Sequence, residues 1–470
     1  MDTVDLLITG GEVITHNRRK HANVAVQQGK IVGVLEPQAA LPRAQRTIDA
    51  TGLYVLPGAV DPHTHIGGAT KVVGTLAAAM KVCTRALAIG GTTTVMEMIP
   101  PTKGLSLKAG LAEAKAARRG TMAVDFAFHP SLASVDDQVI VGLEECAADG
   151  TPSFHGSFEG ARGREPLDEG GLYRLLNLAR SRKMMAVIHA EDARLNREVI
   201  RQTDNAGTLE NVARCRPWFS ETAAVQRSVF MGQITRGPIY FEHLGAGPSL
   251  DAVAGARGAG FPVYGETCPH YLCFSEEIYR TPRGVEFLKS PPLRRREDCE
   301  SLWEGIAHGS ISSVATDESL ALIVEKRRLA ERLPAYEVSG GLNQIEVRLA
   351  VMHNEMVIKR GMDVEKLVYV LAAAPSMIFG LYPRKGTVDI GSDADLVLFD
   401  PKMKKQIRNE DLHQGTDHTI FEGWEVQGVP KMTLSHGKVL VEDGVWVGPE
   451  SDGQWLARQI DPAVIEAPAV

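Results

Sequence analysis

The chain has 470 residues, of which 44% are hydrophobic and 23% are charged, so it can bury a large core within one big domain and a smaller one. Its formal net charge of -7 comes from 51 basic and 58 acidic residues that are spread along the chain without a basic block. This distribution argues against nucleic-acid binding and favours small-molecule partners.

The sequence predicts a protein that neither crosses a membrane nor is secreted. The first twenty residues lack the basic and apolar segments of a secretory signal, and no apolar run is long enough to span a bilayer. We therefore expect a cytoplasmic location. The cysteines form no CxxC pair, so we predict reduced thiols that fill the core. They are Cys83, Cys146, Cys215, Cys268, Cys273 and Cys299.

The first fifty residues predict a small β-domain. Short apolar segments at 6–8, 12–15, 23–26 and 30–35 are separated by glycines, as in strands joined by tight turns.

The middle of the chain, from about residue 53 to residue 381, alternates apolar strands with helical stretches rich in Ala, Leu and Arg. Parallel βα units have this alternation. The candidate strands are 55–61, 93–98, 123–129, 152–155, 185–189, 239–243, 262–266 and 312–317. We predict an α/β fold with a closed (β/α)₈ TIM barrel, because an open doubly wound sheet would usually carry a GxGxxG loop after its first strand.

Apolar strand patterns return after the barrel, at 386–388, 395–399 and 431–441. Two β-rich chain ends around one barrel most simply form one composite β-sandwich. We therefore predict a β-sandwich domain of residues 1–56 with 382–446, a catalytic barrel of residues 57–381 and a C-terminal extension of residues 447–470. The extension has little apolar pattern, so we expect it to pack on a neighbouring subunit.

The strongest chemical signal is the HxH pair of His63 and His65 at the end of the first barrel strand. Residues two apart in a strand point to the same side, so both imidazoles can bind one metal ion. Such a pair alone could be accidental. The other strands end in further candidate ligands, at the rim where barrel enzymes place their catalytic groups. These are His155, His189, His243 and Asp317.

Seven segments, in order along the chain, resemble the motifs of the cyclic amidohydrolases, the family of dihydropyrimidinases, hydantoinases and allantoinases. They are LPGAVDPHTH, VIHAED, EHLG, GETCPHYL, LKSPPLR, ATDES and IFGLYPRKGTVDIGSDADLVLFD, and they cover nearly the whole chain. The resemblance implies a barrel enzyme that uses metal-activated water to hydrolyse a C–N bond of a cyclic amide, imide or ureide. It also implies a homodimer or homotetramer.

The resemblance also implies a set of metal ligands. His63 and His65 match the pair that binds the more buried ion, His189 and His243 match the pair that binds the second ion, and Asp317 matches the carboxylate of the last strand. Imidazole and carboxylate ligands favour one or two Zn²⁺ ions, with Mn²⁺, Fe²⁺ and Co²⁺ left open. Asp317 would deprotonate the attacking water and later protonate the leaving nitrogen. A helix N-cap is the alternative role for Asp317.

One departure from the family concerns the fourth strand, where the family has a carboxylated lysine that bridges both metals and this chain has His155. A neutral imidazole has one free lone pair and cannot bridge two ions as a carbamate does. Three interpretations stay open: a mononuclear enzyme, a pair of ions bridged by hydroxide alone, and a site without catalysis. We expect His155 to bind metal or lie against the metal site, with no carboxylated lysine.

Other departures concern substrate binding. The family tyrosine that follows the lysine is replaced by Gly160, and Arg162 is either a compensating cation or a solvated loop charge. Backbone contacts to the substrate are expected at Ser290 and at the pair Gly340 and Gly341, where the family has Asn-Gly. The glycine-rich loop 66–74, which carries Lys71, is a candidate lid.

Two other functions compete with ring hydrolysis. One is a non-catalytic scaffold, like family relatives that keep the fold and the tetramer but lose metal ligands. The other is a mononuclear amidohydrolase that acts on a different C–N bond, such as a deaminase. The five family ligands that this chain retains argue against the scaffold.

Overall fold

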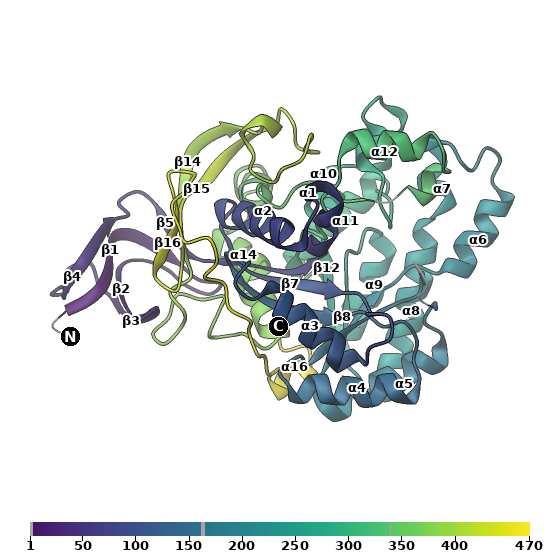
Figure 1. The fold of residues 1–470 in the computed structure, drawn as a ribbon, viewed down its shortest axis with the longest axis horizontal. Helices are drawn as coiled ribbons and strands as arrows, with labels where there is room; N and C mark the ends of the chain where they lie inside the picture. The colour runs from purple at the N-terminus through teal and green to yellow at the C-terminus, as the bar shows by residue number, and fades with distance from the viewer. Residues whose placement is uncertain (1–2, 161–164, 339) are drawn as a thin grey trace.

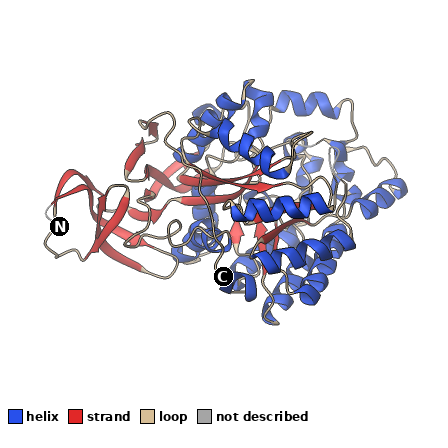
Figure 2. Cartoon of the chain, turned by 60° about the horizontal axis from the view of Figure 1, so that its bottom comes forward, coloured by secondary structure: helices blue, strands red, loops and turns tan. Residues whose placement is uncertain are grey.

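The computed structural model of the chain describes residues 3–160, 165–338 and 340–470. A group of parallel strands surrounded by helices forms the larger part, and a β-rich part that contains the N-terminal strands lies beside it (Figure 1, Figure 2). The predicted α/β class with a β-rich portion is confirmed at this level.

Eight parallel strands, close to those expected from the sequence, occupy the middle of the chain. They are β6 (Ala59–Thr64), β7 (Thr92–Ile99), β8 (Asp125–Pro130), β9 (Ser153–Ser157), β10 (Met185–His189), β11 (Ile239–Phe241), β12 (Val263–Thr267) and β13 (Ser313–Val314). They form two sheets with the orders β6-β7-β8 and β13-β12-β11-β10-β9. Isolated parallel bridges from Ser131 to His155 and from Thr64 to Glu318 connect the two sheets. The carboxyl ends of the strands therefore meet at one rim.

Helices cover the outside of these sheets, and several begin at side-chain caps. Thr75, Ser106, Asp136 and Asp168 each accept a hydrogen bond from a backbone N–H of the first turn. The helices are α1 (Thr70–Val73), α2 (Leu76–Ile89), α3 (Leu107–Arg118), α4 (Asp137–Ala148), α5 (Glu169–Arg182), α6 (Ala193–Gln202), α7 (Val212–Cys215), α8 (Trp218–Thr235), α9 (Gly247–Gly258), α10 (Pro269–Cys273), α11 (Arg296–His308), α12 (Ile323–Ala330), α13 (Arg348–Met352), α14 (Val364–Val368), α15 (Ala374–Ile378) and α16 (Pro462–Glu466).

The β-rich part is one nine-stranded sheet made from both chain ends. Its strands are β1 (Thr3–Ile14), β2 (Arg19–Gln27), β3 (Lys30–Leu35), β4 (Arg43–Asp49), β5 (Tyr54–Pro57), β14 (Leu396–Gln406), β15 (Glu425–Ser435), β16 (Lys438–Glu442) and β17 (Val445–Trp446). The order is β17-β16-β15-β14-β5-β1-β2-β3, with β4 beside β1. The antiparallel pair β5–β14 joins the two ends, and Leu6, Val24 and Leu396 share one apolar core.

Two expectations about strands in this part were wrong. The structure adds β4, which the sequence did not predict, and it forms no strand at 386–388. Gly386 has a φ of +82° and packs against α15, where an added Cβ would lie 2.7 Å from the hydroxyl oxygen of Ser376. The chain therefore turns at this glycine, and Val388 is buried in the core of the β-rich part.

The C-terminal segment also differs from the expectation, because residues 454–465 pack on the barrel of the same chain. The backbone N–H of Phe126 donates to Gln454, and that of Leu456 donates to Phe126. Leu456 and Ile460 join the apolar core formed by side chains of the parallel strands. The guanidinium of Arg458 is buried and donates to the carbonyl oxygen of Phe128 at 2.6 Å. The segment thus completes the apolar core of the parallel strands, and packing on a neighbouring subunit is not needed to explain it.

The cysteines and the apolar helices bear on two expectations from the sequence: reduced thiols in the core, and no segment that spans a membrane. All six cysteines are free, and five of them are buried. In the described part of the chain no single helix is long and apolar enough to cross a membrane; the segments Ile66–Val73 and Leu76–Ile89, bent by 116°, pass that test only together. The cytoplasmic location stays a prediction.

The packing of the C-terminal segment predicts a large cost for truncating Leu456. Leu456→Ala should lower the free energy of unfolding by about 2–5 kcal/mol, because it leaves a cavity in the barrel core. Denaturant unfolding measures this value. Val447→Ala is the control, since Val447 is 52% exposed, and it should change stability by less than about 0.5 kcal/mol. Equal effects of the two variants would contradict the packing described here.

Candidate metal centre

The first group of candidate ligands consists of His63, His65 and Asp317 at the rim where the parallel strands end. The Nε2 atoms of the two histidines lie 3.3 Å apart. Each of them lies 3.3 Å from Oδ1 of Asp317. Two ligand atoms bound to one tetrahedral zinc ion at about 2.0–2.1 Å lie roughly 3.3 Å apart. The three side chains therefore have the spacing of ligands that share one ion.

The orientation of His63 is fixed by a carboxylate behind it. Its Nδ1 lies 2.8 Å from Oε1 of Glu266 on β12, and the hydroxyl of Tyr240 donates to Oε2 of the same glutamate at 2.7 Å. A carboxylate on Nδ1 holds the proton there and leaves Nε2 with a free lone pair for a metal ion.

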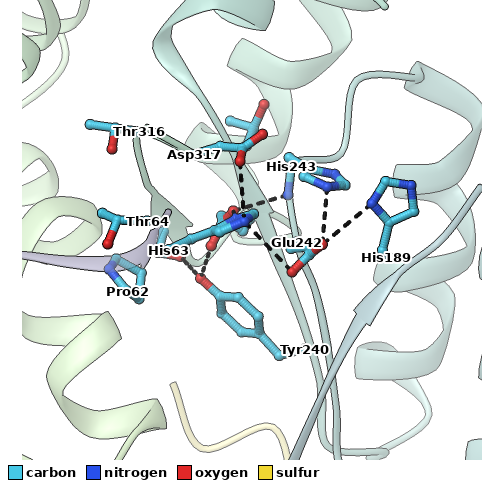
Figure 3. A network of polar contacts seen from close by, with 12 residues as sticks. Pro62, His63, Thr64, His189, Tyr240, Glu242, His243, Thr316 and Asp317 are labelled. Carbon is cyan, nitrogen blue, oxygen red and sulfur yellow. Dashed lines mark hydrogen bonds and ion pairs between the residues drawn. The ribbon is translucent and has the colours of Figure 1, made fainter. Parts of the chain in front are cut away.

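The second group consists of His189 and His243, whose ring centroids lie 4.6 Å apart. His189 ends β10, and His243 follows β11 with a φ of +39°. Between this group and His63 lies the carboxylate of Glu242 (Figure 3). Its Oε1 is 3.1 Å from Nε2 of His243 and 3.4 Å from Nδ1 of His189, and its Oε2 is 3.8 Å from Nε2 of His63.

The sequence did not predict Glu242 as a site residue, although the motif EHLG contains it next to the candidate ligand His243. Neighbouring residues of a strand point to opposite faces, so the pattern gave no reason to place both side chains in the site. The left-handed backbone at His243 ends this alternation. The available signal was a glutamate that directly follows the apolar segment Ile239–Phe241 and directly precedes a candidate ligand.

His155, the residue in place of the family lysine, lies against Glu242. Its Nε2 is 3.2 Å from Oε1 of Glu242, and its Nδ1 is 3.1 Å from the hydroxyl of Ser131. The groups of three or more described side chains that are close enough to hold one ion do not include His155.

Asp317 has a second partner that the sequence reasoning missed. Lys289, in the segment LKSPPLR, pairs with Oδ2 of Asp317, and its Nζ lies 3.1 Å from Nε2 of His270. Burial raises the pKa of Asp317, but Lys289 and His63 hold it well below the usual value. Asp317 is therefore an ionised carboxylate that presents Oδ1 to the first group and Oδ2 to a cation.

The outer side of His189 faces two further carboxylates. Its Nε2 lies 3.4 Å from Oε2 of Glu159 and 3.4 Å from Oε2 of Glu191. The guanidinium of Arg216 pairs with both of these glutamates. This network orients the ring so that Nδ1 faces Glu242, and the sequence reasoning identified none of its ion pairs.

The predicted substrate contacts are placed only in part. Ser290 follows Lys289 and so lies at the same rim. An added Cβ on Gly341 would lie 1.3 Å from the carbonyl oxygen of Ser319, so only glycine fits beside the segment after Asp317. Gly340 lies against Lys326. Arg162 lies outside the described residues.

The structure also describes the candidate lid and the glycine that replaces the family tyrosine. The loop 66–74 is helical, with a 3₁₀ turn at Ile66–Ala69 followed by α1, and the N–H of Gly67 donates to Oε1 of Glu97 at 2.8 Å. Gly160, in place of the family tyrosine, has a φ of +61°, and a Cβ there would lie 2.5 Å from the backbone of Pro166. This position therefore favours glycine.

The protonation of the histidines tests whether the cluster fits a cation. Burial alone would lower the pKa of His63, but Glu242 and other carboxylates raise it to about 10. Burial is likewise outweighed at His189, where the nearby carboxylates of Glu191 and Glu242 raise the pKa to about 10. Burial lowers the pKa of His243 to about 4. The carboxylates thus favour positive charge within the cluster, which a proton or a divalent ion can supply, and the ligand set fits such an ion.

Comparisons with known proteins identify the family. The "Amidohydrolase family" matches residues 54–440 of the chain. A D-hydantoinase of Ralstonia pickettii is 31% identical over 465 residues, which are 97% of this chain and 99% of the relative. The chain therefore belongs to the amidohydrolase family, as the sequence predicted.

Solved structures agree with this assignment. A D-hydantoinase from Bacillus sp. AR9 superimposes with a TM-score of 0.90 at 31% identity, covering 97% of this chain and 100% of the other. A dihydropyrimidinase from Brevibacillus agri NCHU1002 gives a TM-score of 0.89 at 29% identity, covering 96% and 98%. The chain has the fold of these hydrolases along nearly its whole length.

The convergence of His63 and His65 predicts that both are needed for metal binding. Alanine at either position should remove the ion of the first group, because each substitution deletes one of three ligand atoms. Elemental analysis of the purified variants measures the metal content. His308→Ala, an exposed histidine on α11, is the control. Full metal content in both His63→Ala and His65→Ala would reject this ligand assignment.

Proposed function

We propose that the protein is a metal-dependent hydrolase that opens the ring of a cyclic amide, imide or ureide. The observation that carries this proposal is the convergence of His63, His65 and Asp317 beside His189 and His243, in a chain related to hydantoinases over nearly its whole length. The comparisons lend no support to the alternative of a non-catalytic scaffold.

The proposal includes a closed (β/α)₈ barrel and a preference for Zn²⁺. The bridges from Ser131 to His155 and from Thr64 to Glu318 support closure, because they lie at both edges between the two parallel sheets. The imidazole and carboxylate ligands support Zn²⁺, while Mn²⁺, Fe²⁺ and Co²⁺ accept the same ligand types.

In this proposal Asp317 is the acid and base of the reaction. A bound divalent ion lowers the pKa of water and polarises the scissile carbonyl. Asp317 is ionised, and its Oδ1 faces the first ligand group, so it can accept a proton from the attacking water. It can then return that proton to the leaving ring nitrogen. The ion pair with Lys289 holds Oδ2 in place while Oδ1 reacts.

Substrate binding is proposed for the rim that Ser290, Gly340 and Gly341 share with Asp317. Gly341 packs on the backbone of Ser319, where a side chain would not fit. The backbone at Gly341 therefore lies close to the segment that follows Asp317. Backbone groups at Ser290 and Gly340 can donate to and accept from the amide groups of a ring substrate. Arg162 remains a candidate cation for the developing negative charge.

Asp317→Asn should lower the kcat of ring hydrolysis by about 10²–10⁴-fold, because the amide cannot accept the proton of water. Hydantoin, dihydropyrimidine and allantoin are the test substrates, and the metal content of each sample is measured alongside. Asp136→Asn, at the N-cap of α4, is the control and should leave kcat unchanged. Unchanged hydrolysis by the metal-loaded Asp317→Asn variant would reject the assigned role. Release of ammonia without ring opening would instead favour a deaminase.

We also propose that the protein is a homodimer or homotetramer, as the family resemblance implies. Several large apolar side chains are exposed on the outer helices, among them Tyr173 on α5 and Phe230 and Ile234 on α8. Their burial between subunits would remove apolar surface from water. Light scattering at micromolar concentration should give two or four times the chain mass, and a clean monomer would contradict this proposal.

A further inference from the structure

The carboxylated lysine that bridges the metal ions in the family is absent from this chain. Glu242 brings another carboxylate into the site. We propose that Glu242 joins two divalent ions, with Oε2 toward the ion held by His63 and His65 and Oε1 toward the ion held by His189 and His243. This inference rests on the proposed function only for the presence of metal ions, and it does not depend on the substrate.

The positions of the two oxygens support a bridging role. Oε1 is the oxygen near the second group, at 3.1 Å from Nε2 of His243 and 3.4 Å from Nδ1 of His189. Oε2 is the oxygen near the first group, at 3.8 Å from Nε2 of His63 (Figure 3). Each oxygen of a carboxylate has its own lone pairs, so the two can bind different ions, as the two oxygens of a carbamate do.

The charge of Glu242 supports the same role. Its side chain is 3% exposed, and a buried carboxylate needs cationic partners. The ion pairs of Glu242 within the described residues are all with imidazoles and none is with lysine or arginine. Its Oε2 accepts no hydrogen bond from that part of the chain. Once the imidazoles are neutral ligands, the metal ions supply the positive charge that this carboxylate needs.

His155 then acts through Glu242. If the hydroxyl of Ser131 donates to Nδ1 of His155, the proton of the ring lies on Nε2 and is donated to Oε1 of Glu242. This contact holds the carboxylate between the two groups of histidines. His155 is therefore a positioning residue, and the exchange of lysine for histidine does not leave the site without a bridging carboxylate.

A carbamate on Lys289 is the competing source of a bridging group, and the contacts of Lys289 oppose it. Its ammonium pairs with Asp317, so a carbamate would place a second negative charge beside that carboxylate. Glu242 already lies between the histidine groups. The site should therefore fill with metal without carbon dioxide.

The first experiment uses the full-length protein without substitution. The protein is stripped with a chelator and reloaded with Mn²⁺ in buffer freed of carbon dioxide, with and without added bicarbonate. We expect about two ions per chain by elemental analysis and an electron paramagnetic resonance spectrum of two coupled ions, the same in both buffers. Saturation at one ion per chain, or a second ion that binds only with bicarbonate, would overturn the inference.

The second experiment compares two buried glutamates. Glu242→Gln removes the charge and keeps the shape, so the coupled spectrum should disappear and the weaker ion should bind at least about 100-fold less tightly. Glu97→Gln is the matched control, because Glu97 is a buried glutamate of β7 that pairs with Arg118. It should keep both ions and the coupling. A coupled pair of ions in a folded Glu242→Gln variant would refute the bridging role.

The positioning role of His155 has its own test. His155→Ala should weaken binding of the second ion by about 10–100-fold, and His155→Gln, whose amide can donate to Glu242, should restore part of the affinity and the coupled spectrum. Equal spectra of the alanine and glutamine variants would reject this role. Ring hydrolysis is assayed separately: coupled ions without hydrolysis would reject the proposed function, and hydrolysis with one ion would reject the role of Glu242.

Discussion

The pairing of buried carboxylates with imidazoles at the barrel rim is the constraint on which the site depends. An ionised carboxylate away from water costs several kcal/mol unless a cation and hydrogen bonds compensate it. Glu242 and Glu266 are buried, and each lies within 3.2 Å of a histidine nitrogen. Imidazoles compensate such charges only while they are protonated. Divalent ions compensate them in place of these protons and leave the imidazoles free to act as ligands.

The backbone carries strain at two of the proposed ligands. His243 and Asp317 have φ values of +39° and +50°, which cost about 1–3 kcal/mol each for residues other than glycine. Hydrogen bonds hold both conformations: the N–H of Asp317 donates to the carbonyl oxygen of His63 at 3.0 Å, and that of His243 donates to Glu266 at 3.0 Å. These contacts come from neighbouring strands, so the packing of the parallel strands maintains the strain and aims both side chains into the site.

The sequence predicted the strands and the histidines because both follow short-range rules. Apolar strand segments that end in polar residues located His63, His65 and His189 at the rim. The sequence did not predict Glu242, because strand alternation places residues 242 and 243 on opposite faces and the choice of His243 as a ligand left Glu242 outside the site. Only the left-handed backbone at His243 lets both side chains face the site. Lys289 and the C-terminal segment with Leu456 were missed for another reason: their partners lie far away in the sequence, and only the folded chain brings them together.

Anomalous X-ray diffraction from crystals of the zinc-loaded protein tests the central claim most directly, because it locates each ion without reference to activity. The account predicts two anomalous peaks, one at the nitrogens of His63 and His65 and one at those of His189 and His243, with the carboxylate of Glu242 between them. A single peak, or two ions joined by a modified lysine with Glu242 turned away, would contradict it.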